Sequence, residues 1–217
     1  MKKTFPAKLF CLLVASLFIT ANSYAALSGN IVSDAKLALQ IKLQQLKSYQ
    51  ADFTQKVVDI ENTVLQEARG NIVLQQPNKL YWELLAPNDN ILLADGQTLW
   101  NIDPFMEQVV AYNQDSAIEN NPLILLTDPS SNKWLEFNVM VKDKEFIISP
   151  IQQTGSVETL RLVFDRQDKL VQLETTDVQK QTSTLTFSNI LQNKTLTTNK
   201  FVFTMPEGYE LDDQRAL

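Results

Sequence analysis

Apolar and polar residues alternate along most of the chain from residue 51 onward. In residues 77–87, PNKLYWELLAP, the apolar Leu80, Trp82 and Leu84 are separated by more polar neighbours. Successive side chains of a β-strand point to opposite faces of the sheet, so this pattern predicts a strand with one buried face. A tryptophan on such a face usually belongs to an ordinary core, and the rest of the chain has to show whether this face holds something else.

Runs with the same period recur at short intervals and predict about a dozen strands. The predicted strands are residues 51–59, 68–75, 79–85, 90–94, 98–102, 108–112, 135–141, 145–149, 159–164, 170–176, 183–190 and 201–204. Asp95-Gly96 lies between the fourth and fifth runs and is typical of a hairpin turn. Because short strands follow one another without helical crossovers, the chain predicts a strongly curved antiparallel sheet in a single α+β domain.

The segment before the first strand has a helical period instead. Ala35, Leu39, Leu43 and Leu46 recur at spacings of four and three within residues 33–49. These spacings place the four side chains on one face of a helix. The sequence therefore predicts an N-terminal helix over residues 33–49.

A second, shorter helix is predicted in the middle of the chain, where Asn121 suits the N-cap and Pro122 the first helical position. The apolar residues that follow, here called the lid segment, are Leu123, Ile124, Leu125 and Leu126. Four consecutive apolar residues in so short a helix are not expected to face one ordinary core together. The lid segment is therefore a candidate for a movable cover over an apolar face.

Bulky apolar residues at alternating positions form two groups, which are candidates for the wall of a cavity if the sheet stays open. They are Leu80, Trp82, Leu84, Ile91, Leu93 and Trp100 in the first group, and Phe146, Ile148, Leu162 and Phe164 in the second. Two helical segments offer little cover for a sheet of this length. The sheet either closes into a filled barrel or stays open around a cavity for an apolar ligand, and the pattern favours neither.

The first 25 residues have the features of a secretory signal peptide. Three lysines precede the apolar run of residues 9–20, and Ser23-Tyr24-Ala25 is a typical cleavage site. The run is too short to span a bilayer, and Cys11 lies inside it rather than at the cleavage site, where a lipoprotein signal would place it. We therefore expect residues 1–25 to be removed and residues 26–217 to form one soluble, exported domain.

Composition limits the chemistry of the mature chain. Removal of three lysines leaves 16 Lys and Arg of the original 19, against 25 Asp and Glu, a net charge of −9. An acidic chain without a basic cluster argues against a nucleic-acid partner. The mature chain also lacks His and Cys, so Ser-His-Asp and Cys-His catalysis and the usual zinc or copper sites are excluded.

The remaining motifs give no support for an enzyme. The sequence contains no P-loop, no G-x-G-x-x-G and no G-x-S-x-G. Asp212-Asp213 is the only adjacent acidic pair, and we interpret it as part of a solvated tail. The sequence thus predicts a protein that is not an enzyme and that uses neither a metal nor a cofactor.

Several stretches together resemble the periplasmic outer-membrane lipoprotein carrier protein family, LolA. They are Phe53-Thr54-Gln55, Pro77-Asn78 followed by Trp82, Asp95-Gly96-Gln97-Thr98-Leu99-Trp100, Asp103-Pro104 with Glu107-Gln108-Val109, Asn121-Pro122, and Asp212-Asp213-Gln214-Arg215. They occur in the family's order across nearly the whole mature chain. No single stretch is specific, but the set is.

The resemblance implies an unclosed, strongly curved antiparallel barrel of about 11 strands with a helical lid over a hydrophobic cavity. It implies a monomeric chaperone in the periplasm for acylated lipoproteins, which receives its cargo from an inner-membrane ABC transporter and passes it to the outer-membrane receptor LolB. Gln76 departs from the pattern, since family members commonly carry at this position an Arg that controls the lid. A neutral amide still donates hydrogen bonds, although without the strength that charge adds.

Other functions stay open beside this one. A carrier or sensor of free fatty acid, phospholipid or glycolipid on the same fold is the main alternative. An envelope enzyme using two carboxylates has no support in the sequence, because nothing singles out a pair among the 25 acids. A purely structural role requires a filled barrel with no cavity.

Overall fold

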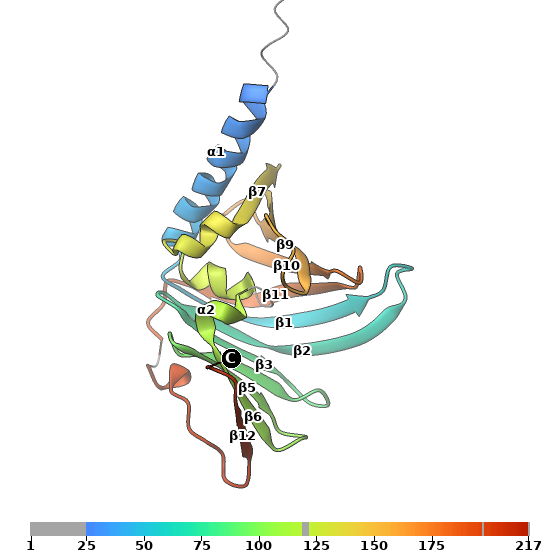
Figure 1. The fold of residues 1–217 in the computed structure, drawn as a ribbon, viewed down its shortest axis with the longest axis vertical. Coiled ribbons are helices and arrows are strands. Elements are labelled where there is room, and N and C mark those ends of the chain that lie inside the picture. Colours follow the sequence, from blue (N-terminus) through green and yellow to red (C-terminus); the bar gives the residue numbers. More distant parts are fainter. Residues whose placement is uncertain (1–24, 119–121, 197, 217) are drawn as a thin grey trace, which may run out of the picture.

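The computed structural model describes residues 25–118, 122–196 and 198–216 (Figure 1). The strands are β1 (Ser48–Val58), β2 (Val64–Gln75), β3 (Lys79–Leu84), β4 (Asn90–Ala94), β5 (Thr98–Asp103), β6 (Gln108–Asn113), β7 (Phe137–Lys142), β8 (Glu145–Pro150), β9 (Val157–Phe164), β10 (Leu170–Asp177), β11 (Thr182–Gln192) and β12 (Glu210–Asp213). The helices are α1 (Ala25–Gln44), α2 (Gln114–Ala117) and three 3₁₀ helices, η1 (Pro122–Thr127), η2 (Asn132–Glu136) and η3 (Thr198–Phe201).

All twelve strands belong to one sheet in the order β12-β6-β5-β4-β3-β2-β1-β11-β10-β9-β8-β7. β12 and β7 form its two edges, so the sheet is curved but not closed, as the resemblance implied (Figure 1). The prediction of a wholly antiparallel sheet is wrong at one place. β12 pairs with β6 in the parallel direction, because the chain returns from β11 over a long connection before it reaches the edge of the sheet.

The C-terminal region holds two further corrections. The predicted strand at residues 201–204 is absent, and η3 followed by irregular chain takes its place. Asp212 and Asp213, interpreted from the sequence as a solvated tail, lie in β12 instead. Both segments have only short apolar stretches, and their conformation depends on the strands that they meet rather than on their own pattern.

The N-terminal helix begins at Ala25 and ends at Gln44, whereas the sequence predicted residues 33–49. Its apolar stripe continues beyond the last helical residue because Leu46 is buried in the following turn, where its N–H donates to the carbonyl of Leu43 at 2.9 Å. The predicted signal peptide, residues 1–25, lies outside the described residues except for Ala25. No helix among the described residues is long and apolar enough to cross a membrane.

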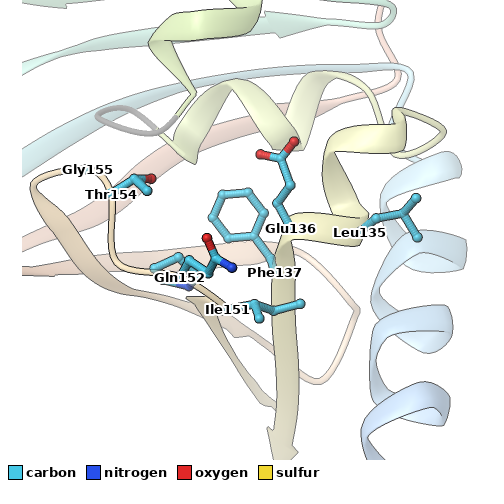
Figure 2. Close-up of a pocket in the computed structure, with 8 residues that line it drawn as sticks. Leu135, Glu136, Phe137, Ile151, Gln152, Thr154 and Gly155 are labelled. Atoms are coloured by element: carbon cyan, nitrogen blue, oxygen red, sulfur yellow. The ribbon is translucent and has the colours of Figure 1, made fainter.

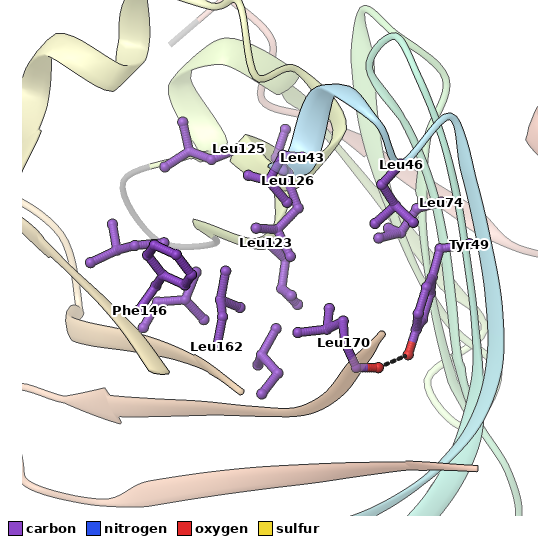
Figure 3. Packing of buried hydrophobic residues seen from close by; sticks show 14 of the residues in the cluster. Leu43, Leu46, Tyr49, Leu74, Leu123, Leu125, Leu126, Phe146, Leu162 and Leu170 are labelled. Carbon is purple, nitrogen blue, oxygen red and sulfur yellow. Dashed lines mark hydrogen bonds between the residues drawn. The ribbon is translucent and has the colours of Figure 1, made fainter. Parts of the chain in front are cut away.

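One face of the sheet, called the inner face, carries the main hydrophobic core together with the stripe of α1. Leu39 and Leu43 of α1 are fully buried in this core, which confirms the predicted amphipathic helix. Tyr49 of β1 is buried there too, and its hydroxyl donates to the carbonyl of Leu170 at 2.8 Å (Figure 3). Burial raises the pKa of the Tyr49 hydroxyl, so it remains a neutral donor.

Candidate functional site

The first part of the predicted wall is on β3. Leu80, Trp82 and Leu84 share the inner face, since Leu80 belongs to the core and the other two pack against it. In the sheet Trp82 lies between Ile72 of β2 and Leu92 of β4. The alternation in residues 77–87 therefore predicted the correct face for all three residues.

Trp82 is held by an aromatic neighbour two strands away. Its ring stacks on that of Phe53 with centroids 5.9 Å apart and an angle of 22°. Gly70 on the intervening strand β2 makes this possible: a Cβ there would lie 2.5 Å from Phe53 Cζ and 2.0 Å from the carbonyl oxygen of Glu83. Only a residue without a side chain lets the Phe53 ring cross β2 and reach the indole.

The second group of predicted wall residues lies on β8 and β9, and all four are buried in the same core. Phe146 pairs with Leu162 across the two strands, and Phe146 packs edge-to-face on Phe164 with centroids 5.8 Å apart. Ile148 follows Phe146 on the same face of β8. Seven of the ten predicted wall residues thus share the inner face.

The other three, Ile91, Leu93 and Trp100, lie on the opposite face, here called the outer face. Leu93 is paired with Tyr81 of β3 and with Trp100 of β5, and Tyr81 alternates with the inner-face residues of its strand. Placing these three residues in the same wall is therefore wrong. For Ile91 and Leu93 the cause is the composition of β4, which is apolar on both faces, so that its pattern does not say which face turns inward. Trp100 of β5 shares their face because it pairs with Leu93.

A C-terminal segment, residues 199–204, covers the outer face. Phe203 stacks on Trp100 with centroids 3.8 Å apart and an angle of 7°. A hollow of about 400 Å³ remains between this segment and the strands, lined by Tyr81, Ile91, Leu93, Ile102, Asn199, Lys200, Val202, Phe203 and Thr204. The outer apolar residues therefore have their own cover, made by the same chain.

The lid segment is on the inner side, within η1. Leu123, Ile124, Leu125 and Leu126 are 8%, 2%, 1% and 2% exposed, and all four belong to the core. Figure 3 shows leucines of this segment between Phe146 and Leu162 on one side and Leu43 of α1 on the other. The expectation that they cannot all face one core is wrong, because η1 is enclosed by the curved sheet and α1 on several sides.

Few polar contacts hold the end of the lid segment to the sheet. The Asn78 N–H donates to the carbonyl of Thr127 at 3.1 Å. Asn78 is fixed in turn by Gln114, a buried residue whose Nε2 donates to the Asn78 carbonyl at 3.0 Å and whose Oε1 accepts from the Gly96 N–H at 3.0 Å. Sequence reasoning missed Gln114, because a Gln just after a predicted strand is too common to serve as a signal.

Gln76, predicted to control the lid, contacts a different part of the cover. Its Nε2 donates to the carbonyl of Leu43 in the last turn of α1 at 2.6 Å, and its N–H donates to the Lys47 carbonyl at 3.0 Å. Among the described hydrogen bonds, the one that joins the turn at residues 76–78 to the end of the lid segment is the bond from the Asn78 N–H to the Thr127 carbonyl. Gln76 therefore holds α1, which covers the inner face beside the lid segment.

α1 is also joined to the chain that follows the lid segment. Gln40 Nε2 donates to the carbonyl of Pro129 at 2.8 Å, and Lys36 Nζ donates to that of Trp134 at 3.0 Å. The Trp134 indole donates to the Asp128 carbonyl at 3.0 Å. α1, η1 and η2 are thus linked into one cover, and hydrogen bonds to backbone carbonyls account for most of its polar ties.

Charged groups approach the wall from both sides. On the inner side Lys42 Nζ of α1 lies 4.9 Å from the centroid of the Phe164 ring and pairs with Asp168 Oδ1 at 2.6 Å. On the outer side are Asp95 and Glu83. Burial alone would raise the pKa of Asp95, but hydrogen bonds from the N–H groups of Thr98 and Gln97 and from the Trp100 indole, each 2.9 Å long, hold it below its usual value. Burial, followed by the Glu83 carboxylate, raises the pKa of Tyr81 to about 12. Neither group lies on the apolar inner face.

A surface pocket of about 420 Å³ opens beside the core at the β7 edge of the sheet (Figure 2). It is lined by Leu135, Glu136, Phe137, Pro150, Ile151, Gln152, Thr154 and Gly155. Phe137 belongs both to this pocket and to the core, whereas Leu135 and Ile151 are 73% and 56% exposed. The core is therefore only one side chain away from solvent at this rim.

The described residues contain no cluster of three or more His, Cys, Asp or Glu side chains suited to a metal ion. What the site offers is a large apolar wall and an apolar cover that share one core. Such an arrangement suits reversible burial of a flexible apolar ligand rather than bond-making chemistry.

Comparison with known proteins agrees with this geometry. A family profile described as "Outer membrane lipoprotein carrier protein LolA" matches residues 44–204. A protein of Aeromonas salmonicida (strain A449) named "Outer-membrane lipoprotein carrier protein" is 32% identical over 204 residues, covering 94% of this chain and 98% of its own length. One of the same name from Yersinia enterocolitica is also 32% identical, covering 87% and 93%.

Among solved structures, an uncharacterized conserved protein from Thermus thermophilus superposes with a TM-score of 0.50 at 11% identity. The match covers 84% of this chain and 99% of that one. At so low an identity the likeness concerns the fold alone, and it shows that the same curved architecture occurs in a distant sequence.

Proposed function

The chain belongs to the family of the outer membrane lipoprotein carrier protein LolA, and on this basis we propose that it carries acylated lipoproteins across the periplasm. The observation that supports this function most directly is the shared core of wall and cover. Leucines of η1 and α1 lie against the apolar inner face of the sheet in the place where acyl chains would be shielded.

The size of the hydrophobic effect explains why a carrier needs such a cover. Three acyl chains of about 15 methylenes each gain roughly 36 kcal/mol on leaving water, at about 0.8 kcal/mol per CH₂. Noncovalent affinities do not exceed about 20 kcal/mol. Transfer therefore has to be an exchange between apolar environments, from membrane to carrier to membrane, in which the net free-energy difference is small.

Exchange is provided by the cover. When the cargo enters, contacts between wall and acyl chains replace contacts between wall and lid segment, so the free energy of closure subtracts from the affinity for cargo. The bonds to be broken are few, among them Asn78 N–H to the Thr127 carbonyl and Gln76 Nε2 to the Leu43 carbonyl. Gln76 makes its bond without the charge of an Arg, so we expect α1 to open with less resistance.

Family membership supports a pathway of handover. The predicted signal peptide would bring the protein to the periplasm, the inner-membrane ABC transporter would load it, and the receptor LolB would accept its cargo. The seven inner-face residues of the predicted wall contact the acyl chains in this proposal. The rim pocket around Phe137 is the place where a chain could first reach the core without passing a strand.

The test is a mass measurement on the mature protein, isolated from the periplasm without detergent, before and after incubation with spheroplasts that display lipoproteins. We expect a one-to-one complex with an intact acylated lipoprotein, which passes its cargo to outer membranes only when the receptor is present. Recovery of free fatty acid, phospholipid or glycolipid alone would show that the site binds one of these lipids instead of a lipoprotein. Recovery of no lipid at all would leave the inner face as an ordinary core.

A further inference from the structure

The otherwise apolar inner face contains two buried polar atoms without partners. Among the side chains that the structure describes, Trp82 Nε1 and Gln55 Oε1 are the buried atoms that lack a hydrogen bond. Gln55 follows Phe53 on the same face of β1, and Phe53 stacks on Trp82. The donor thus belongs to one ring of the stacked pair, and the acceptor follows the other ring by two residues along β1.

The other two tryptophans show how unusual this is. Trp100 Nε1 donates to Asp95 Oδ2 at 2.9 Å, and Trp134 Nε1 donates to the Asp128 carbonyl at 3.0 Å. Buried indole N–H groups normally find such partners, because leaving one unpaired costs about 1 to 3 kcal/mol. In Gln55 the amide nitrogen is paired with Ser183 Oγ at 2.7 Å while its oxygen is not.

The two atoms match the polar part of an acylated amino terminus. An ester carbonyl accepts one hydrogen bond from an indole N–H, and the N–H of an N-acyl amide donates one to a carboxamide oxygen. Aliphatic chains offer neither group. A lipoprotein with ester-linked and amide-linked chains on its first residue offers both, next to the beginning of the chains.

We propose that Trp82 Nε1 donates to an ester carbonyl of the bound lipoprotein and that Gln55 Oε1 accepts from its N-acyl amide N–H. This inference rests on the proposed carrier function and assigns the head of the lipid anchor to the Phe53–Trp82 end of the wall. In the closed protein both atoms are covered without partners, which disfavours closure; cargo satisfies them, which favours the loaded form.

The first experiment separates the indole N–H from the indole ring. Trp82→Phe keeps an aromatic ring on Phe53 but removes the donor. Two synthetic lipopeptides serve as probes, one with two ester-linked chains and one N-acyl chain, the other with ether links in place of the esters. The smaller ring loses contact with the chains of both probes, so the readout is the difference between them. We expect Trp82→Phe to weaken binding of the ester probe by about fivefold to tenfold more than binding of the ether probe.

The second experiment addresses Gln55. Gln55→Met should weaken binding of the ester probe by a similar factor, about fivefold, but should not affect a probe whose N-acyl amide is methylated and has no N–H. Ser183→Ala is the matched control, because it removes the same Gln55–Ser183 bond and keeps the acceptor. It should leave binding of both probes unchanged.

Thermal unfolding of the empty protein supplies an independent readout. Trp82→Phe should not lower the unfolding temperature through lost hydrogen bonding, whereas Trp134→Phe should, since it removes the bond to the Asp128 carbonyl. Equal weakening of ester and ether probes by Trp82→Phe, or weakening of neither, overturns the assignment and leaves the carrier function intact. Failure of the wild-type protein to bind any lipopeptide overturns the carrier function and this inference with it.

Discussion

The two faces of strands β3 to β5 carry similar amounts of apolar side chain but are covered in different ways. On the inner face, Leu80 and Trp82 meet a cover of leucines from η1 and α1. On the outer face, Trp100 and its neighbours meet the C-terminal segment, residues 199–204. Both covers come from the same chain, so burial alone does not distinguish a movable cover from a fixed one.

The difference lies in the contacts. The outer cover is fixed by aromatic and cationic partners: Phe203 stacks on Trp100 at 3.8 Å, and Lys200 Nζ lies 4.8 Å from the centroid of the Tyr81 ring. Arg215 adds a third contact, 5.5 Å from the Trp100 ring. Such contacts depend on geometry and would not be replaced by an acyl chain.

The inner cover has a cationic contact as well, Lys42 Nζ at 4.9 Å from the centroid of the Phe164 ring, and an ion pair, Lys42–Asp168. It otherwise depends mainly on aliphatic packing, which is non-directional and which lipid chains can imitate. Its polar ties include single hydrogen bonds to backbone carbonyls, such as that from Asn78 to Thr127. Cargo can therefore replace the cover of the inner face, because that cover is chemically similar to acyl chains. Substitutions on the two faces should therefore have different effects on cargo.

Gly70→Ala should reduce stability most, because Gly70 lies where Phe53 and β3 pack closely against β2. The added Cβ would meet the Glu83 carbonyl oxygen at 2.0 Å and Phe53 Cζ at 2.5 Å, so β2 and β3 would have to separate. We expect the free energy of unfolding in urea to fall by about 4 kcal/mol or more. Gly208→Ala is the control, where nothing lies within 4 Å and the positive φ of 85° should cost only about 1 kcal/mol. Equal losses would contradict the close-approach argument.

Leu125→Ala should loosen the inner cover. Leu125 is 1% exposed in the core, so its truncation should reduce the free energy of unfolding by about 3 kcal/mol. Because a weaker cover competes less well with acyl chains, the variant should retain lipoprotein longer and pass it more slowly to the receptor. Leu65→Ala, at a leucine of β2 that is 51% exposed, should change neither quantity. Unchanged transfer kinetics in Leu125→Ala would show that closure does not oppose loading.

Phe203→Ala should weaken the outer cover without changing the inner face. Loss of the stack on Trp100 should lower the free energy of unfolding by about 1 to 2 kcal/mol. Binding and transfer of lipoprotein should remain as in the wild type, since Trp100 faces away from the inner wall. A loss of cargo binding comparable with that of an inner-wall variant would place the outer face in the site.

The sequence predicted the faces of β3, β8 and β9 correctly, although the apolar Ile147 of β8 and Val163 of β9 interrupt the alternation. It failed for β4, where Ile91, Leu92, Leu93 and Ala94 are apolar on both faces. Only the register Tyr81↔Leu93 decides which of them turn inward, and register depends on the neighbouring strand. A second cover on the outer face could not be predicted, since residues 199–204 resemble a further strand in pattern.

The lid segment was found in the sequence, but its environment was not. In a 3₁₀ helix three residues complete a turn, so the side chains of Leu123 to Leu126 point in all directions around the axis. All four are buried because the sheet curves around them and α1 closes the remaining side. The curvature of the sheet, which places Phe146 opposite Leu43, is a property of the assembled strands and is not encoded within the segment.

Lowering the pH should have a small effect on the stability of the outer cover through Asp95. The carboxylate of Asp95 holds the outer hairpin and the Trp100 indole, and its pKa is lowered in the folded protein. Its contribution to stability is therefore complete above the ordinary pKa of 3.8 and is lost as the pH falls through the lower folded value.

Asp95→Asn should lower the free energy of unfolding by about 1 kcal/mol at pH 7, and the difference from wild type should shrink in urea titrations below pH 3.8. Asp89→Asn, at an exposed carboxylate between the β3 and β4 strands, should show no such change. The inner cover has an ion pair of its own, Lys42–Asp168, and the hydrogen bond from Lys42 lowers the pKa of Asp168 as well. Lipoprotein retention is therefore compared between Asp95→Asn and wild type at the same pH, where we expect no difference. A difference would show that the two covers are coupled through the turns that Gln114 joins.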